Sequence, residues 1–225
     1  MIKEMIDNVS FCASKEIAMR ALNGAFWDIE NGVFKMVASD GYRLALTDIK
    51  VSEDARAEFI LSLEALKILK KFLNIAETYT VSFFDDTVVF LADTGDTAIF
   101  RNTQEIFPDY KKVLPKSFNA GFVVEAQQLK EALRKIIVME SDFVNIKIGD
   151  KLVLITNDTQ GSVKIEVPVL EKFGEIDLKF NPKFLMEGLK QFGSVVKMKF
   201  VDEFSPAQMT GDDKQLVYIV LPLRK

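Results

Sequence analysis

The chain has 225 residues, 48% of them hydrophobic, and a formal net charge of −4, which suffices for one large domain or two ordinary ones with apolar cores. It contains no histidine, and this excludes the commonest general base, histidine-dependent nucleophiles and the usual zinc ligands. No apolar stretch reaches the roughly 20 residues of a membrane span, and the start MIKEMIDN is not a secretion signal. We therefore expect a globular, cytoplasmic protein without a membrane partner.

The first half of the chain predicts a helix, a run of strands, a second helix and more strands. Apolar residues at helical spacing indicate a helix over residues 2–12. Strands are expected at 22–29, 33–38 and 42–48, with Glu30-Asn31-Gly32 and Ser39-Asp40-Gly41 as turns. Ser62 is a plausible cap for a helix that ends at residue 73, and strands follow at 79–84, 87–92 and 97–102.

The same order recurs in the second half. Helices are expected at 126–139 and 181–192, with strands at 144–149, 151–156 and 162–169 between them and at 196–201, 206–211 and 216–223 after them. The second helices of the two halves end at Phe72 and Phe192, an offset too long for a solenoid repeat. The pattern predicts an α+β protein of two similar domains, 1–118 and 119–225, each with two helices packed on antiparallel sheet, joined through Phe107 to Pro115.

The single cysteine, Cys12, lies among apolar residues and is expected to be a core thiol, because one cysteine forms neither an internal disulfide nor a cysteine-rich metal site. Charge is unevenly distributed, since basic residues outnumber acidic ones on the four predicted helices of this acidic chain. Such segregation is a possible footprint for sequence-independent phosphate contact. Lysine is also an ordinary residue of helix surfaces, so propensity alone explains the pattern equally well.

The sequence shows no catalytic pattern. Asp85-Asp86 and Asp40-Gly41 lie where strands reverse, which needs no role beyond a solvated turn. A glycine-rich phosphate loop, a Walker-type lysine and a serine-centred elbow are all missing from the sequence. We therefore expect a protein that is not an enzyme and that uses no metal or cofactor. At the C-terminus, Ile219, Leu221 and Leu223 stand at strand spacing and Pro222 interrupts pairing, which favours either core packing or an apolar groove between the domains.

Five segments together resemble a known family. They are ALNGAFWDI, VASDGYRLAL, FPDYKKVLP, DLKFNPKFLMEGL and the terminal YIVLPLRK, in this order across the whole chain. The combination is similar to the bacterial DNA sliding clamp, the β subunit of DNA polymerase III. The resemblance begins at the first helix of the family's second domain and runs to the end of its third, so the family's first domain has no counterpart here.

The resemblance implies an architecture and two kinds of partner. In the family, subunits associate head to tail into a six-domain ring whose helices face double-stranded DNA without reading its sequence. Peptides from the replicative polymerase, the clamp loader and repair proteins dock between the second and third domains. A short peptide rich in Gln, Leu and Phe is the shared ligand of that groove.

The resemblance implies two sets of contacts, peptide contacts at positions that match the family's groove and DNA contacts at basic residues, most of them on the predicted helices. The expected peptide-binding residues are Leu22, Ser39, Gly41, Tyr42, Arg43, Leu44, Pro108, Lys112, Val113, Phe184, Phe204, Pro206, Ile219, Val220, Leu221, Pro222, Leu223 and Arg224. The expected DNA-binding residues are Lys3, Lys15, Arg20, Lys67, Lys70, Lys71, Lys130, Arg134, Lys135, Lys183 and Lys190. Tyr42 stands where histidine is frequent in the family, Lys112 where arginine is frequent, and Phe204 and Pro206 where smaller residues occur.

Three functions are consistent with these features of the sequence. The first is a processivity factor that tethers replication and repair proteins to DNA. The second is a clamp fragment that binds partner peptides without encircling DNA, since the first domain of the family is not matched. The third is a magnesium-dependent nuclease or phosphatase that uses the aspartates.

Overall fold

The computed structural model describes residues 1–16, 18–157, 161–212 and 214–224. The chain divides into two compact units, Met1–Tyr110 and Lys111–Lys225. The boundary predicted from the sequence lies near residue 118, whereas the structure divides after Tyr110, so residues 111–119, which precede the first strand of the second unit, belong to that unit.

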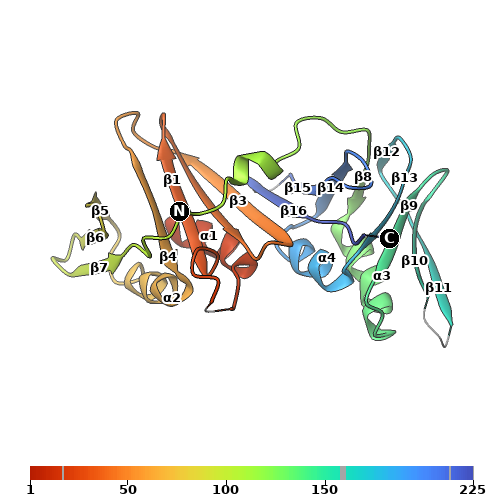
Figure 1. Ribbon diagram of the computed structural model, residues 1–225, viewed down its shortest axis with the longest axis horizontal. Helices are drawn as coiled ribbons and strands as arrows, with labels where there is room; N and C mark the ends of the chain where they lie inside the picture. Colours follow the sequence, from red (N-terminus) through yellow and green to blue (C-terminus); the bar gives the residue numbers. More distant parts are fainter. Residues whose placement is uncertain (17, 158–160, 213, 225) are drawn as a thin grey trace. The chain divides into compact units, whose positions relative to one another are not determined.

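The first unit contains two antiparallel sheets and two helices (Figure 1). One sheet has the order β3-β2-β1-β4, and the other has the order β5-β6-β7. Their elements in chain order are α1 (Ile2–Val9), β1 (Gly24–Glu30), β2 (Val33–Ser39), β3 (Arg43–Lys50), β4 (Ala57–Ser62), α2 (Leu63–Phe72), β5 (Tyr79–Phe83), β6 (Thr87–Ala92) and β7 (Thr97–Arg101).

Local chemistry explains several of these boundaries. Asn31 and Gly32 both have positive φ, 51° and 75°, as a two-residue hairpin turn between β1 and β2 requires. Ser62 Oγ accepts a 3.2 Å hydrogen bond from Ala65 N, which confirms the predicted cap of α2. The helix predicted over 2–12 is shorter than expected, because α1 ends at Val9 and residues 10–12 tighten into a 3₁₀ turn.

The core of the first unit lies between the β1 sheet and the elements that cover it. Trp27 on β1 is 1% exposed, and its ring centroid lies 4.8 Å from those of Phe34 and Phe59. Helix α1 buries Met5, Ile6 and Val9 against this core. Cys12 is fully buried, which confirms the prediction of a core thiol.

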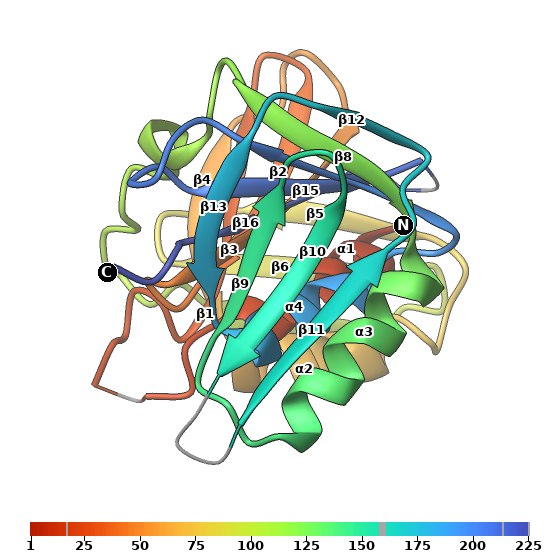
Figure 2. The same cartoon turned by 90° about the vertical axis from the view of Figure 1, so that its right-hand side faces the viewer.

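The second unit also has two antiparallel sheets and two helices. The orders are β12-β8-β14-β15-β16 and β11-β10-β9-β13; the latter sheet faces the viewer in Figure 2 with α3 beside it. The elements are β8 (Ala120–Glu125), α3 (Ala126–Val138), β9 (Val144–Ile148), β10 (Leu152–Asn157), β11 (Ser162–Val167), β12 (Glu171–Phe173), β13 (Ile176–Phe180), α4 (Pro182–Leu189), β14 (Val195–Phe200), β15 (Ala207–Gly211) and β16 (Leu216–Val220).

Helix α4 is fixed by a capping residue at its N-terminus and by close packing against β16. Asn181 Oδ1 accepts hydrogen bonds from Lys183 N (2.9 Å) and Phe184 N (3.4 Å), and Pro182 occupies the first helical position. Gly188 lies so near the ring of Tyr218 that a Cβ there would be 2.5 Å from Cε1. Only glycine lets α4 approach β16 this closely, and α4 packs against α3 on its other side.

The predicted α+β class with two similar domains is confirmed, and some strand predictions are wrong. Four strands were missed: β4, β8, β12 and β13. The strand predicted at 216–223 ends at Val220, because Pro222 has no N–H for pairing. Leu223 instead donates a single backbone hydrogen bond of 2.7 Å to Lys179 O of β13.

Candidate functional site

The turn between β2 and β3 carries four of the expected peptide-binding residues, and Asp40 organises it. Asp40 Oδ1 accepts hydrogen bonds from Tyr42 N and Arg43 N at 3.0 Å, and Asp40 Oδ2 pairs with Arg43 Nε at 2.9 Å. Ser39 Oγ donates to Arg43 O at 2.7 Å. Gly41 has a φ of 89°, which favours glycine. The turn therefore fixes Arg43 at 9% exposure and presents Tyr42 at 65% exposure.

The acidic residues considered for catalysis lie in turns between strands, Asp40 between β2 and β3 and Asp85-Asp86 between β5 and β6. The Asp40 carboxylate is engaged by the contacts just described, and the main-chain carbonyl of Asp86 accepts a 2.8 Å hydrogen bond from Asn102 N. Over the described part of the chain, no three histidine, cysteine or acidic residues gather in a way that would hold a metal ion. Within the same residues, no helix is long and apolar enough to cross a bilayer.

The segment that precedes the boundary packs firmly on the first unit. Phe107 stacks on Phe26 of β1 with centroids 5.1 Å apart and planes 7° from parallel, and Tyr110 meets Phe26 edge-on at 6.2 Å. Pro108 between them stays exposed. The 3₁₀ turn Tyr110–Val113 then crosses the boundary and exposes Lys112 and Val113, so three expected peptide contacts, Pro108 before the boundary and these two after it, are exposed.

A hollow of about 500 Å³ in the second unit collects three more expected contacts. Phe204, Leu223 and Arg224 line it, together with Asp177, Leu178, Lys179 and Glu203. Phe204 is 79% exposed although it is a large apolar residue. The Leu223-to-Lys179 hydrogen bond closes one wall by fastening the end of the chain to β13. An apolar hollow with an exposed aromatic residue at its rim is suited to accept an apolar side chain of a ligand.

Asp202 fixes the loop that carries Phe204. Its Oδ1 accepts hydrogen bonds from Phe204 N at 2.8 Å and from Ser205 N at 2.7 Å. The hydrogen bonds from Phe204 and Ser205 lower the pKa of the Asp202 carboxyl, because they stabilise its charged form. Sequence reasoning missed Asp202 and Lys179; an aspartate two residues before an exposed aromatic residue is the turn signal that would have found the former.

The other expected peptide contacts differ in exposure. Leu44, Ile219 and Val220 are buried, whereas Leu221 and Leu223 are 38% and 40% exposed. Leu22, Pro206, Pro222 and Phe184 are half-buried. Phe184 is not among the residues that line the hollow, and its carbonyl accepts a 2.8 Å hydrogen bond from Tyr218 Oη.

The expected DNA-binding residues lie on helices, on the segment after α1 or, for Lys190, directly after α4. All but two are exposed; Lys70 and Lys130 are half-buried. Several are held by local contacts. Lys3 Nζ donates to Asn74 Oδ1 at 2.6 Å, Lys70 pairs with Asp7 of α1, and Lys130 Nζ donates to Phe192 O at 3.1 Å. In the second unit, Arg134, Lys183 and Lys190 rim a hollow of about 570 Å³ between α3 and α4.

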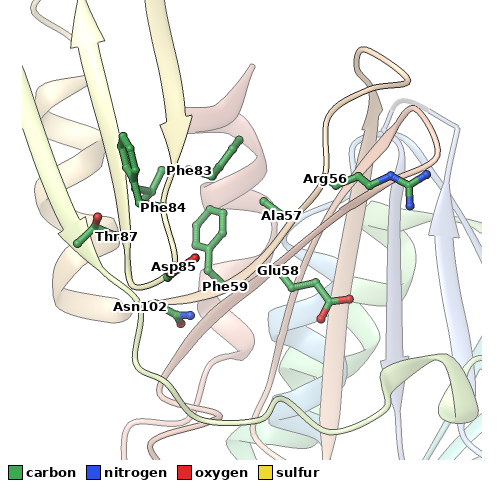
Figure 3. Close-up of a pocket in the computed structure, with 10 residues that line it drawn as sticks. Arg56, Ala57, Glu58, Phe59, Phe83, Phe84, Asp85, Thr87 and Asn102 are labelled. Atoms are coloured by element: carbon green, nitrogen blue, oxygen red, sulfur yellow. The ribbon is translucent and has the colours of Figure 1, made fainter.

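A further hollow of about 260 Å³, in the first unit, was not expected from the sequence. It is lined by residues of β4, β5 and β6 and their turns, including Arg56, Phe59, Phe83, Asp85 and Asn102. Figure 3 shows Phe59 and Phe83 on the strands that flank it. The hollow of the second unit that Phe204 lines, which we call the Phe204 hollow, has the equivalent position. Each of the two hollows lies next to the strand that precedes the second helix of its unit, β4 or β13. Because β4 was not predicted from the sequence, a hollow lined by its residues could not be expected.

Known proteins match both units. Residues 1–109 match the family model of the DNA polymerase III beta subunit, central domain, and residues 111–224 match that of its C-terminal domain. The beta sliding clamp of Pseudomonas aeruginosa is 26% identical over 233 residues, which cover 99% of this chain and 63% of that protein. That of Bacillus subtilis is 21% identical over 236 residues, which cover 100% and 62%.

A solved structure agrees with these matches. The DNA polymerase III beta subunit of Thermotoga maritima superposes with a TM-score of 0.94 at 34% identity, covering 100% of this chain and 63% of that one. The chain thus spans somewhat less than two thirds of the length of these relatives. Family models that match nearly every residue in both units lead to one conclusion: the chain belongs to the DNA polymerase III beta subunit family, the beta sliding clamps, and contains its central and C-terminal domains.

Proposed function

We propose that this chain is a module of a non-enzymatic DNA polymerase processivity factor in the cytoplasm, which tethers polymerases, the clamp loader and repair proteins to DNA during replication. Family membership supports this role. The observation that carries it within the molecule is the Phe204 hollow, because an exposed apolar site at family positions needs a partner side chain to cover it.

The partner of this hollow is a short peptide rich in Gln, Leu and Phe. Its apolar anchors enter the site expected from the family, which combines the Tyr42 turn and the Pro108–Val113 segment with Phe204, Leu221 and Leu223. Each fully buried Leu or Phe anchor contributes roughly 1.5–3 kcal/mol to such a complex. Phe204 and Pro206 stand where the family has smaller residues. They therefore restrict the shape of the apolar side chain that this part of the site accepts.

Double-stranded DNA is the second partner. The exposed lysines and arginines of α1 to α4 contact phosphates without reading bases, so the chain remains free to move along the duplex. Arg134, Lys183 and Lys190, which rim one hollow, form a local concentration of positive charge in an acidic protein. Encirclement requires a closed head-to-tail ring, as the resemblance to the family implies.

The alternative is that the chain binds partner peptides and does not encircle DNA. It requires only the exposed hollow around Phe204, which does not depend on a ring. Light scattering of the full chain, followed by retention on nicked circular DNA, separates the two. A closed oligomer that is retained until the circle is linearised supports the ring, and a monomer without retention supports the alternative.

The peptide site is tested by titrating a clamp-binding peptide of a replicative polymerase into the full chain. We expect micromolar binding that is weakened by Leu22→Ala, Leu221→Ala and Leu223→Ala. Leu170→Ala is the matched control, because Leu170 is a similarly exposed leucine, 58%, outside the expected site. Equal binding by all four variants rejects the site, whatever the result of the DNA experiment.

A further inference from the structure

The hollow of about 260 Å³ in the first unit, which we call the Phe59 hollow, is formed by the second half of that unit. Its lining residues come from β4 and the residue before it, from the hairpin of β5 and β6, and from the segment after β7. In that segment, Thr103 N donates a 3.2 Å hydrogen bond to Ile60 O of β4. Leu223 N makes the same contact with Lys179 O of β13 in the second unit, so the Phe59 hollow and the Phe204 hollow are bounded in the same way.

Three aromatic rings gather at the Phe59 hollow. Phe59 is 8% exposed, and its ring centroid lies 5.4 Å from that of Phe83, with the ring planes 39° apart. Phe84 adds the third ring and is 63% exposed, although it is a large apolar residue. In the second unit, Leu178 stands at the place of Phe59, three residues before the residue that caps the second helix. The hollow of the first unit is therefore the more aromatic of the two.

Asp85 adds a negative charge to these rings. It lies in the tight turn between β5 and β6, which is closed by a 2.8 Å hydrogen bond from Phe84 N to Thr87 O. Figure 3 shows Asp85 beside Phe59, whereas the charged end of Arg56 extends away from the rings. Among the described residues, no hydrogen bond or ion pair engages the Asp85 carboxylate. Its charge is therefore available to a ligand.

The second unit places cations of its own at the equivalent hollow. Lys179 and Arg224 line the Phe204 hollow. Their counterparts in the first unit, assigned from the backbone hydrogen bond that bounds each hollow, are Ile60 and Gln104, and neither carries a charge. The Phe59 hollow thus lacks these two positive charges and keeps the carboxylate of Asp85. A cationic group from another molecule complements this combination of rings and negative charge.

We propose that the Phe59 hollow binds an arginine side chain of a partner protein. Its volume is below the roughly 300–1,000 Å³ of sites for drug-sized ligands, so it suits a single side chain. A guanidinium group is planar, stacks on aromatic rings and donates paired N–H groups to a carboxylate, whereas the ammonium group of lysine is more strongly hydrated. This contact lies outside the expected peptide-binding residues and does not rest on them.

The probe is the capped tripeptide acetyl-Gly-Arg-Gly-amide. It is titrated into the full chain while backbone amide and aromatic signals are followed by NMR. We expect saturable shifts centred on residues 56–59, 83–88 and 102, with a dissociation constant in the millimolar range, because one side chain supplies all the contacts. The same tripeptide with citrulline keeps the shape of arginine and removes its charge, and we expect it to bind about tenfold more weakly.

Variants of the β5–β6 turn test the two parts of the site. Asp85→Asn removes the charge at nearly constant shape and is expected to weaken binding of the arginine tripeptide about tenfold. Phe84→Leu removes the exposed ring and is expected to weaken binding severalfold. Asp86→Asn is the matched control, because Asp86 is exposed in the same turn and is not among the residues that line the hollow. All three positions are exposed, and unchanged amide spectra elsewhere show that the variants fold.

Tripeptides with lysine or leucine in place of arginine identify the occupant. Weaker binding of both supports arginine. Equal binding of the lysine tripeptide makes the hollow a general cation site, and tighter binding of the leucine tripeptide makes it an apolar site; either result overturns the proposal.

The proposal also fails if the citrulline and arginine tripeptides bind equally, if Asp85→Asn and Asp86→Asn have equal effects, or if residues of the hollow show no shifts at saturating probe. None of these measurements involves DNA or a clamp-binding peptide, so this proposal and the proposed function fail separately.

Discussion

Tyr110 Oη donates a 2.6 Å hydrogen bond to Asp28 Oδ2, and both side chains are buried, at 5% and 2% exposure. The bond fastens the last residue of the first unit to β1, next to the stacked rings of Phe107 and Phe26. It thereby holds the segment that presents Pro108 at the surface.

Tyr110→Phe keeps the ring and removes this donor. We expect the free energy of unfolding of the first unit to fall by about 1–3 kcal/mol, because Asp28 loses a buried hydrogen-bond donor. Urea unfolding monitored by fluorescence of Trp27, the single tryptophan, measures this. Tyr42→Phe is the control, since that side chain is 65% exposed, and a similar loss there would contradict the assignment.

The same bond predicts a loss of stability at alkaline pH. Burial, and next the hydrogen bond to Asp28, raise the pKa of Tyr110 well above its ordinary value of 10.0. The folded state therefore keeps a proton that the unfolded state releases, so stability is unaffected below pH 10 and falls as the pH rises further. Unfolding of the parent and of Tyr110→Phe between pH 8 and pH 11, in steps of about one unit, should show the steeper decline in the parent. Parallel curves would refute this.

Asp202→Ala should weaken binding of the clamp-binding peptide severalfold, because the loop that carries Phe204 loses two backbone hydrogen bonds. Asp202→Asn keeps an acceptor oxygen at the same place and should restore much of the affinity. Calorimetric titration of the three proteins measures this. Since the pKa of Asp202 is lowered, the contribution of these hydrogen bonds is present at neutral pH and is lost as the pH falls through that lowered value. Equal affinities in all three proteins would show that the loop does not position the ligand.

Gly188→Ala should destabilise the second unit by roughly 1–3 kcal/mol, the usual effect of overpacking. The new Cβ would collide with the ring of Tyr218, which is fully buried and fixed by its hydrogen bond to Phe184 O. Gly149→Ala is the matched control, because nothing lies within 4 Å of a Cβ there. Thermal unfolding compares the stability of the two variants. An unchanged stability in Gly188→Ala would mean that β16 shifts to make room for the new methyl group.

The double variant Lys183→Gln, Lys190→Gln should bind duplex DNA less tightly and with a shallower salt dependence. Each lost phosphate contact reduces the slope of log K against log salt by about 0.9. Lys147→Gln, Lys164→Gln on the β9–β10–β11 sheet is the control of equal charge. Fluorescence anisotropy over a range of salt concentrations measures the slopes. Identical slopes would remove the α3–α4 hollow from the DNA contact surface.

The helices and hairpins of both units were predictable because their signals are local. Asn31-Gly32 specifies its turn and Ser62 its cap through backbone geometry and one side-chain oxygen. Strands β8 and β4 were missed for the opposite reason. Their burial depends on partners far away in the chain, as the pairing of Ala120–Glu125 with β14 shows, so their alternation is weak in the sequence.

The residue pattern by itself determined the α+β class, the two similar halves and, through ordered motifs, the family. These follow from periodicity and from turn chemistry, which act between near neighbours in the chain. Only the tertiary structure decided that Phe204, Leu223 and Lys179 share one hollow and that Asp202 holds its rim. Side chains far apart in sequence meet only when strands pair and helices pack, and no local signal encodes the space that remains between them.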